Sequence, residues 1–176
     1  MNAFDRKRQT RRCDSIVGRS VAAVVALGFL AGACASKAAF TDESERDESG
    51  DVVEAGEVGS LRLKVGDCLG AEAVGEVESV PVVPCSEPHD SELFYSFELA
   101  GDMFPGKEAT IELAQEGCIT EFDAFIGLAY AESVWDITAI YPTEHTWDAI
   151  NDREVLCGVF PLSDEDTVGS ALGVAE

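Results

Sequence analysis

The stretch Val155-Leu156-Cys157-Gly158-Val159-Phe160 carries no polar side chain in six consecutive positions. A strand that is apolar on both faces belongs at the centre of a sheet, with other structure on each side of it. We therefore expect residues 155–160 to form a central strand around which the other elements are arranged. Shorter strand signals lie at 61–65 and 80–83.

Two segments before this stretch alternate between apolar and polar residues, which is typical of half-buried strands. One covers residues 93–99, with Phe94 as an exception, and the other covers residues 135–141. Between them, apolar residues recur every three or four positions and predict one face of a helix that ends at Gly127. The residues of that face are Ile111, Ala114, Cys118, Phe122 and Phe125. One long helix packed on a small antiparallel sheet is an α+β fold of two layers.

Four of the six cysteines lie in the region expected to fold: Cys68, Cys85, Cys118 and Cys157. An even number in a small exported domain indicates two disulfides, and sequence alone allows three pairings. Cys118 lies on the apolar helix face and Cys157 lies in the central strand, so the pattern favours a bond between them. Cys68 and Cys85 would then close a local loop. Because no Cys-x-x-Cys spacing occurs, we expect neither a redox dithiol nor a metal site, and no cofactor.

The N-terminus has the features of an export signal. Residues 1–33 hold six basic and two acidic side chains, and no charge interrupts residues 21–33. A basic start, a short apolar run and small residues at its end are typical of a secretory signal peptide. The run ends in Leu30-Ala31-Gly32-Ala33-Cys34, which resembles a bacterial lipobox, so Cys34 is the expected lipidation site. The alternatives are cleavage without lipid, which gives a secreted protein, and an uncleaved membrane anchor.

The charge of the chain excludes nucleic acid as a partner. It has 12 basic and 34 acidic residues, a net charge of −22, whereas phosphate binding needs clustered Lys and Arg. Residues 34–60 are rich in Ser, Gly, Asp and Glu, and we expect an acidic flexible linker there. Residues 163–176 are similar in composition and predict an acidic disordered tail. The folded domain is therefore expected over 61–162.

Several motifs occur together in that range: Val65-Gly66-Asp67-Cys68-Leu69, Val83-Pro84-Cys85-Ser86-Glu87-Pro88-His89-Asp90-Ser91-Glu92, Tyr141-Pro142, Trp147 and Asp152-Arg153-Glu154-Val155-Leu156-Cys157. In this combination they resemble the septum-formation domain of actinobacterial envelope proteins. The resemblance implies an outward-facing domain of a lipoprotein or single-span membrane protein, a role around septation and no enzymatic activity. A glycine commonly precedes the Asp-Arg pair in that family. Here Asn151 takes its place, and Asn also tolerates a left-handed turn.

Four residues are candidates for structural or ligand contacts: His89, Asp90, Arg153 and Trp147. His89 and Asp90, with Glu92, are residue types that ligate metals. Neighbouring side chains at a strand start point apart, however, which favours local hydrogen bonds. Arg153 is expected to pair with a carboxylate such as Asp67 or Asp90, and the alternative is a clamp for an anionic ligand.

Two further groups of residues lie close together in the sequence. Tyr141, His145 and Trp147 share one loop, where they either belong to the core or stack on a sugar or peptide of the cell wall. Glu144 and Asp148 suggest a carboxylate pair for glycoside cleavage, although the sequence does not fix their separation.

Together these observations favour an exported accessory domain that is not an enzyme. It is expected to be held by lipid at the outer face of the cell membrane and to contact envelope or division proteins. Two other hypotheses remain open. The acidity also suits a binding module for a cationic molecule or a divalent metal, because the chain after residue 33 carries a charge of −26. The last hypothesis is a wall hydrolase that uses acidic residues.

Overall fold

The computed structural model describes residues 40–71, 75–163 and 165–176. The expected signal peptide at 1–33 and the expected lipidation site at Cys34 lie outside the described residues. Within the described part of the chain, no helix is both long enough and apolar enough to cross a membrane.

The described residues form a six-stranded antiparallel sheet, a two-stranded hairpin and two α-helices. The sheet has the order β3-β5-β4-β6-β8-β7, with bounds Gly56–Gly59, Ser79–Val83, Cys68–Leu69, Ser91–Glu98, Glu154–Pro161 and Trp135–Ile140 in that order. The hairpin pairs β1 (Glu45–Arg46) with β2 (Val52–Glu54). The helices are α1 (Lys107–Ile126) and α2 (Glu144–Ile150), and 3-10 turns occur at η2 (Ser60–Arg62) and η3 (Tyr130–Glu132).

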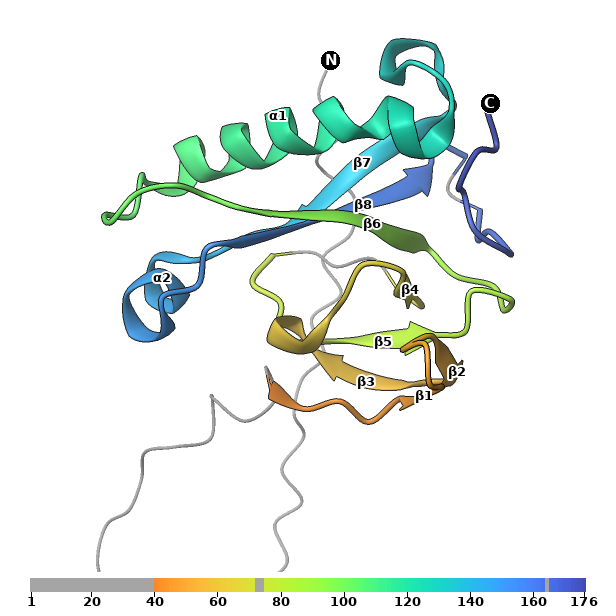
Figure 1. Ribbon diagram of the computed structural model, residues 1–176, viewed down its shortest axis with the longest axis horizontal. Coiled ribbons are helices and arrows are strands. Elements are labelled where there is room, and N and C mark those ends of the chain that lie inside the picture. The colour runs from red at the N-terminus through yellow and green to blue at the C-terminus, as the bar shows by residue number, and fades with distance from the viewer. Residues whose placement is uncertain (1–39, 72–74, 164) are drawn as a thin grey trace, which may run out of the picture. The chain divides into compact units, whose positions relative to one another are not determined.

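The sheet is curled (Figure 1). It buries two separate apolar cores. The helix-side core lies between α1 and one face of β6, β8 and β7. From α1 it receives Ala114, Cys118, Phe122 and Ile126, which are spaced by four residues. The sheet-side core lies on the other face, where β3, β4 and β5 contribute Val58, Leu69, Val80 and Val82. The α+β class is therefore right, but the sheet is larger than expected and a second helix is present.

Strand β8 is buried on both faces, as its sequence predicts. It pairs with β6 on one side and with β7 on the other. Val155, Cys157 and Val159 face the helix-side core, whereas Leu156 belongs to the sheet-side core. Each face of the strand thus meets its own apolar layer, which is why no position between 155 and 159 is polar.

A β-bulge explains why Phe94 interrupts the alternation of β6. Leu93 pairs with Gly158 and Tyr95 pairs with the adjacent Cys157, so Phe94 is the extra residue of the strand. A bulge changes which face the following side chains occupy. Leu93 accordingly belongs to the sheet-side core, whereas Phe94 and Tyr95 pack in the helix-side core.

Left-handed residues end both helices, as predicted for α1. Gly127 follows α1 with φ 86°, and its N–H donates to the carbonyl of Asp123 at 2.9 Å. Asn151 follows α2 with φ 57°. Asn is one of the few residues other than glycine that adopt this conformation readily, so Asn151 ends α2 as a glycine would.

The expected flexible linker is wrong for residues 40–60, which fold onto the domain. Strand β3 pairs with β5, and residues 41–43 continue along β3 through two backbone hydrogen bonds. In one the Glu43 N–H donates to the carbonyl of Glu57 (2.9 Å), and in the other the Gly59 N–H donates to the carbonyl of Thr41 (2.7 Å). Except for the half-buried Asp42, the acidic residues of this segment are exposed, while its backbone and two valines supply the pairing and the burial.

The expected disordered tail is also wrong for the described residues 165–176. Ala171 is only 2% exposed, and it packs in the helix-side core. The Ala175 N–H donates to the carbonyl of Ile126 at 2.9 Å, and so satisfies a carbonyl that the end of α1 would leave unpaired. The prediction of disorder was made from composition, which does not show where backbone groups form hydrogen bonds.

We predict that Gly56→Ala detaches the segment around residue 43 from β3. A Cβ atom at position 56 would lie 2.4 Å from backbone atoms of Glu43 and Ser44, so the segment must move. Overpacking of this kind costs about 1–3 kcal/mol of unfolding free energy. Denaturant unfolding and hydrogen exchange at the Glu43 amide measure the effect. Glu57→Ala removes an exposed side chain from the same strand and serves as control. Unchanged protection at Glu43 in the Gly56 variant would contradict the packing described here.

Candidate functional site

The four late cysteines form two disulfides with the favoured pairing. Cys118–Cys157 joins α1 to β8, and Cys68–Cys85 joins β4 to the loop before β6. Among the described residues, one group of three potential metal ligands is found, formed by Cys68, Cys85 and Glu92 within 4.8 Å of one another. Metal binding by cysteine requires the thiolate, so in the disulfide form two of these three ligands are lost.

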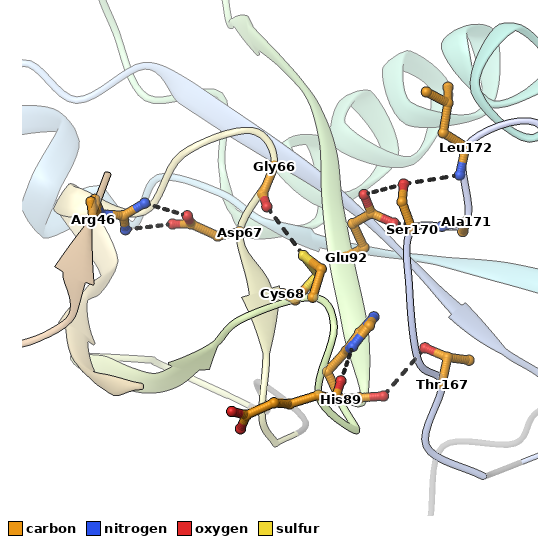
Figure 2. Close-up of a disulfide and its surroundings, with 12 residues drawn as sticks. Arg46, Gly66, Asp67, Cys68, His89, Glu92, Thr167, Ser170, Ala171 and Leu172 are labelled. Carbon is orange, nitrogen blue, oxygen red and sulfur yellow. Dashed lines mark hydrogen bonds and ion pairs between the residues drawn. A yellow bond between two sulfur atoms is a disulfide. The ribbon is translucent and has the colours of Figure 1, made fainter. Parts of the chain in front are cut away.

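The motif between Cys85 and Glu92 holds the C-terminal segment in place (Figure 2). His89 is 2% exposed, and its Nδ1 lies 2.8 Å from the carbonyl oxygen of Glu87. The backbones of His89 and Thr167 exchange two hydrogen bonds, at 3.0 and 2.8 Å. The Glu92 carboxylate accepts hydrogen bonds from the Ser170 hydroxyl and from the next backbone N–H, both at 2.7 Å.

These contacts favour the structural interpretation of the motif over the metal site. In the described residues, His89 and Asp90 do not join Glu92 in a cluster of potential ligands. Asp90 is half-buried at the start of β6, and its backbone N–H donates to the carbonyl of Leu69 at 2.8 Å.

The expected partner of Arg153 is wrong. Its guanidinium lies 3.5 Å from the centre of the Trp147 ring instead of pairing with Asp67 or Asp90. It donates to the carbonyls of Trp147 (3.1 Å) and Asp152 (2.8 Å), and its Nε donates to that of Gly101 (3.3 Å). The aromatic face and the carbonyls at the end of α2 offer the cation several partners at once, and no carboxylate is needed.

Trp147 is a core residue and does not form a stacking surface. It is 1% exposed, and its Nε1 donates to the carbonyl of Asp102 at 3.2 Å. Its ring meets the edge of Phe104, with 5.7 Å between the ring centroids. Of its two loop neighbours, Tyr141 is half-buried and His145 is exposed.

Arg46 takes the role that the sequence suggested for Arg153. It donates to both carboxylate oxygens of Asp67, at 2.6 and 3.0 Å, and its Nε donates to Asp42 at 3.1 Å (Figure 2). The side chains of Arg46 and Asp67 are 11% and 3% exposed. The hydrogen bond to Asp67 raises the pKa of Arg46 above its usual value. Sequence reasoning missed this residue because it lies in a segment interpreted as linker, yet it is the only basic residue between positions 38 and 61.

A cavity of about 230 Å³ lies where the end of β7, the start of α2, β8 and η2 meet. Its apolar lining includes Phe104, which packs against the helix-side core, and Ile140 and Leu156 of the sheet-side core. A capping box fixes the start of α2 beside it. The Thr143 hydroxyl accepts from the Thr146 N–H at 3.1 Å, and the Thr146 hydroxyl accepts from the Thr143 N–H at 3.0 Å.

Acidic side chains dominate the charged lining of this cavity. They are Glu76, Glu144, Asp152 and Glu154, and the one basic residue of the lining is Lys107. Partial burial raises the pKa of Glu154, and the charges of Asp152 and Glu98 act in the same direction, against a hydrogen bond from Ser96. Negative charges in the cavity lining, those of Asp152 and Glu154, therefore repel each other.

The structure only partly brings the suggested glycosidase pair to this cavity. Glu144 and Tyr141 line it, whereas Asp148 is exposed on α2 and does not. Of the other three carboxylates, Asp152 and Glu154 lie two residues apart at the start of β8, whereas Glu76 lies far from them in the chain, so sequence spacing did not reveal the set. The one sequence feature that indicated an acidic site is the net charge, which suggested a cationic ligand.

A family model described as septum formation matches residues 65–176. The chain belongs to the septum-formation family. The match confirms the resemblance and continues past residue 162, so the septum-formation domain includes the C-terminal segment that packs on His89 and Glu92. Residues 40–64, with β1, β2 and β3, precede the match. No curated protein and no solved structure matches the chain.

We predict that Asp67→Asn lowers the unfolding free energy by about 3 kcal/mol, because the largely buried Arg46 charge loses its two-bond carboxylate partner and keeps its bond to Asp42. Arg46→Met should have a similar effect, and the double variant should lose less than the sum of the two. Chemical denaturation of all three proteins gives the coupling energy. Arg62→Met, at an exposed cation nearby in sequence, should have little effect. Additive losses in the double variant would contradict a direct pair.

We predict that Glu154→Gln stabilises the protein at pH 7 but not at low pH. The folded state raises the pKa of this carboxyl, so it binds the proton more tightly than the unfolded chain does. Ionisation of Glu154 therefore costs stability, and that cost disappears below the ordinary value of 4.5. Melting temperatures at pH 7 and pH 3.5 measure the gain. Glu116→Gln removes one exposed charge from α1, outside the cavity, and controls for net charge. Equal gains in both variants at pH 7 would argue against local repulsion.

Proposed function

We propose that the chain is an exported accessory protein of the septum, held by lipid at the outer face of the cell membrane, that binds a partner and is not an enzyme. The observation that carries the binding part is the cavity, which combines apolar lining with four carboxylates. The motif residues His89, Glu92 and Arg153 all form hydrogen bonds with the chain's own backbone. These bonds favour a structural role for the three residues.

The two disulfides support export. Such bonds form and persist in oxidising surroundings outside the cytoplasm, and a domain of this size gains stability from them. The sequence Leu30–Cys34 supports lipid anchoring, as described above. Together these features support a position on the outer face of the membrane.

A lipid at Cys34 would hold the domain close to the membrane. Thr41 is bonded to Gly59 of β3, so at most seven residue-to-residue steps separate the lipidated cysteine from the folded part. Even a fully extended chain spans only about 3.5 Å per residue, or about 25 Å here. Partners are therefore expected among proteins at the membrane surface.

We predict that Cys34→Ala abolishes both palmitate labelling and photo-crosslinking to septal membrane proteins in cells. A photo-reactive amino acid at exposed position 148, close to the cavity lining residue Glu144 on α2, reports the crosslinks. Cys13→Ala lies inside the expected signal peptide and should change neither readout. Palmitate labelling that persists in the Cys34 variant would rule out the anchor. Release of wall fragments by the purified wild-type protein would rule out a purely binding role.

A further inference from the structure

The cavity is suited to one long cationic side chain. Its volume of about 230 Å³ is below the range of about 300–1,000 Å³ that is usual for small-molecule sites. Phe104, Ile140 and Leu156 supply apolar lining, and the charged lining consists of four carboxylates and one lysine. Lysine and arginine side chains combine an apolar stem with a charged end, so they match a pocket built in this way. A bare metal ion would leave the apolar lining unused.

The cavity also lies beside the part of the sheet edge that remains open. β7 is the last strand of the sheet and pairs only with β8 in the described residues. On its outer edge, the Trp135 N–H donates to the Ser133 hydroxyl (3.1 Å) and the Ile137 N–H donates to the Asp136 carboxylate (2.7 Å). The chain's own side chains thus occupy the first two donors of this edge.

Ala139 is the next position on the same edge, because donors alternate between the two sides of an antiparallel strand. It lines the cavity, together with the residues that follow it up to Pro142. Exposed strand edges bind extended segments through backbone hydrogen bonds, and neighbouring pockets then select side chains. One extended segment would therefore pair with the backbone at Ala139 and also place a cationic side chain in the cavity.

We propose that this cavity binds a lysine or arginine side chain of a partner protein, whose extended backbone pairs with β7 at Ala139. This inference rests on the proposed binding function and names the chemistry of the partner. Four carboxylates against Lys107 give the charge complementarity, and the open edge favours a polypeptide over a free cation. The repulsion between Asp152 and Glu154 would be relieved when the cation enters.

Fluorescence anisotropy tests this inference with the full-length protein purified in detergent. The probe is the labelled peptide Gly-Ser-Val-Lys-Val-Ser-Gly, and matched peptides carry norleucine in place of lysine or an N-methyl group on the following valine. We expect the lysine peptide to bind with a Kd below about 1 mM, and both changes to weaken binding about tenfold. Asp152→Asn and Glu154→Gln should weaken it as well, whereas Glu116→Gln should not.

Three results would overturn the inference. Equal binding of the lysine and norleucine peptides would show that the cavity does not recognise the positive charge. Equal binding of the N-methyl peptide would show that the peptide backbone does not pair with β7. Displacement of the lysine peptide by a muropeptide with a free amine, at equal or lower concentration, would assign the cavity to the cell wall. If these tests fail while the crosslinks of the wild-type protein in cells persist, the proposed binding function stands and only the assigned partner chemistry is wrong.

Discussion

The burial of β8 on both faces is the constraint on which the rest of the structure depends. A strand of this kind needs an apolar layer on each side, and one layer alone would leave either Val155 or Leu156 in water. Helix α1 supplies the first layer, and the curled half of the sheet supplies the second. Each layer carries one disulfide: Cys118–Cys157 ties α1 to β8, and Cys68–Cys85 lies within the opposite layer.

The sequence was sufficient to predict the elements whose apolar residues repeat regularly. Strands β6, β7 and β8 and helix α1 all belong to this class, as does the pairing of Cys118 with Cys157. It was insufficient for β3 and the C-terminal segment, which are short, rich in small or acidic residues, and held mainly by backbone hydrogen bonds. Backbone groups are the same in every residue, so composition carries no record of where they pair.

The candidate site could be predicted only in outline, for a related reason. Glu76, Lys107 and Glu154 meet at one cavity although they are separated by long stretches of chain. Only tertiary folding brings them together, so no local spacing reveals the set. Arg153 is a second example of a site residue that the sequence predicts only in part. Its need for a partner was readable from the sequence, but the choice of the Trp147 face and backbone carbonyls over a carboxylate was not.

The folding of residues 40–60 also changes how an anchored domain would meet its partner. A long flexible linker would let the acidic domain move away from the negatively charged membrane surface. With the proposed lipid at Cys34, a connection of at most about 25 Å would instead keep the acidic domain close to anionic lipid. Both surfaces attract positive charge, and their fields add in the space between them. A basic segment of a membrane protein would gain from both, whereas an acidic one would be repelled by both. With that anchor, the short connection would favour the cationic partner that we propose for the cavity.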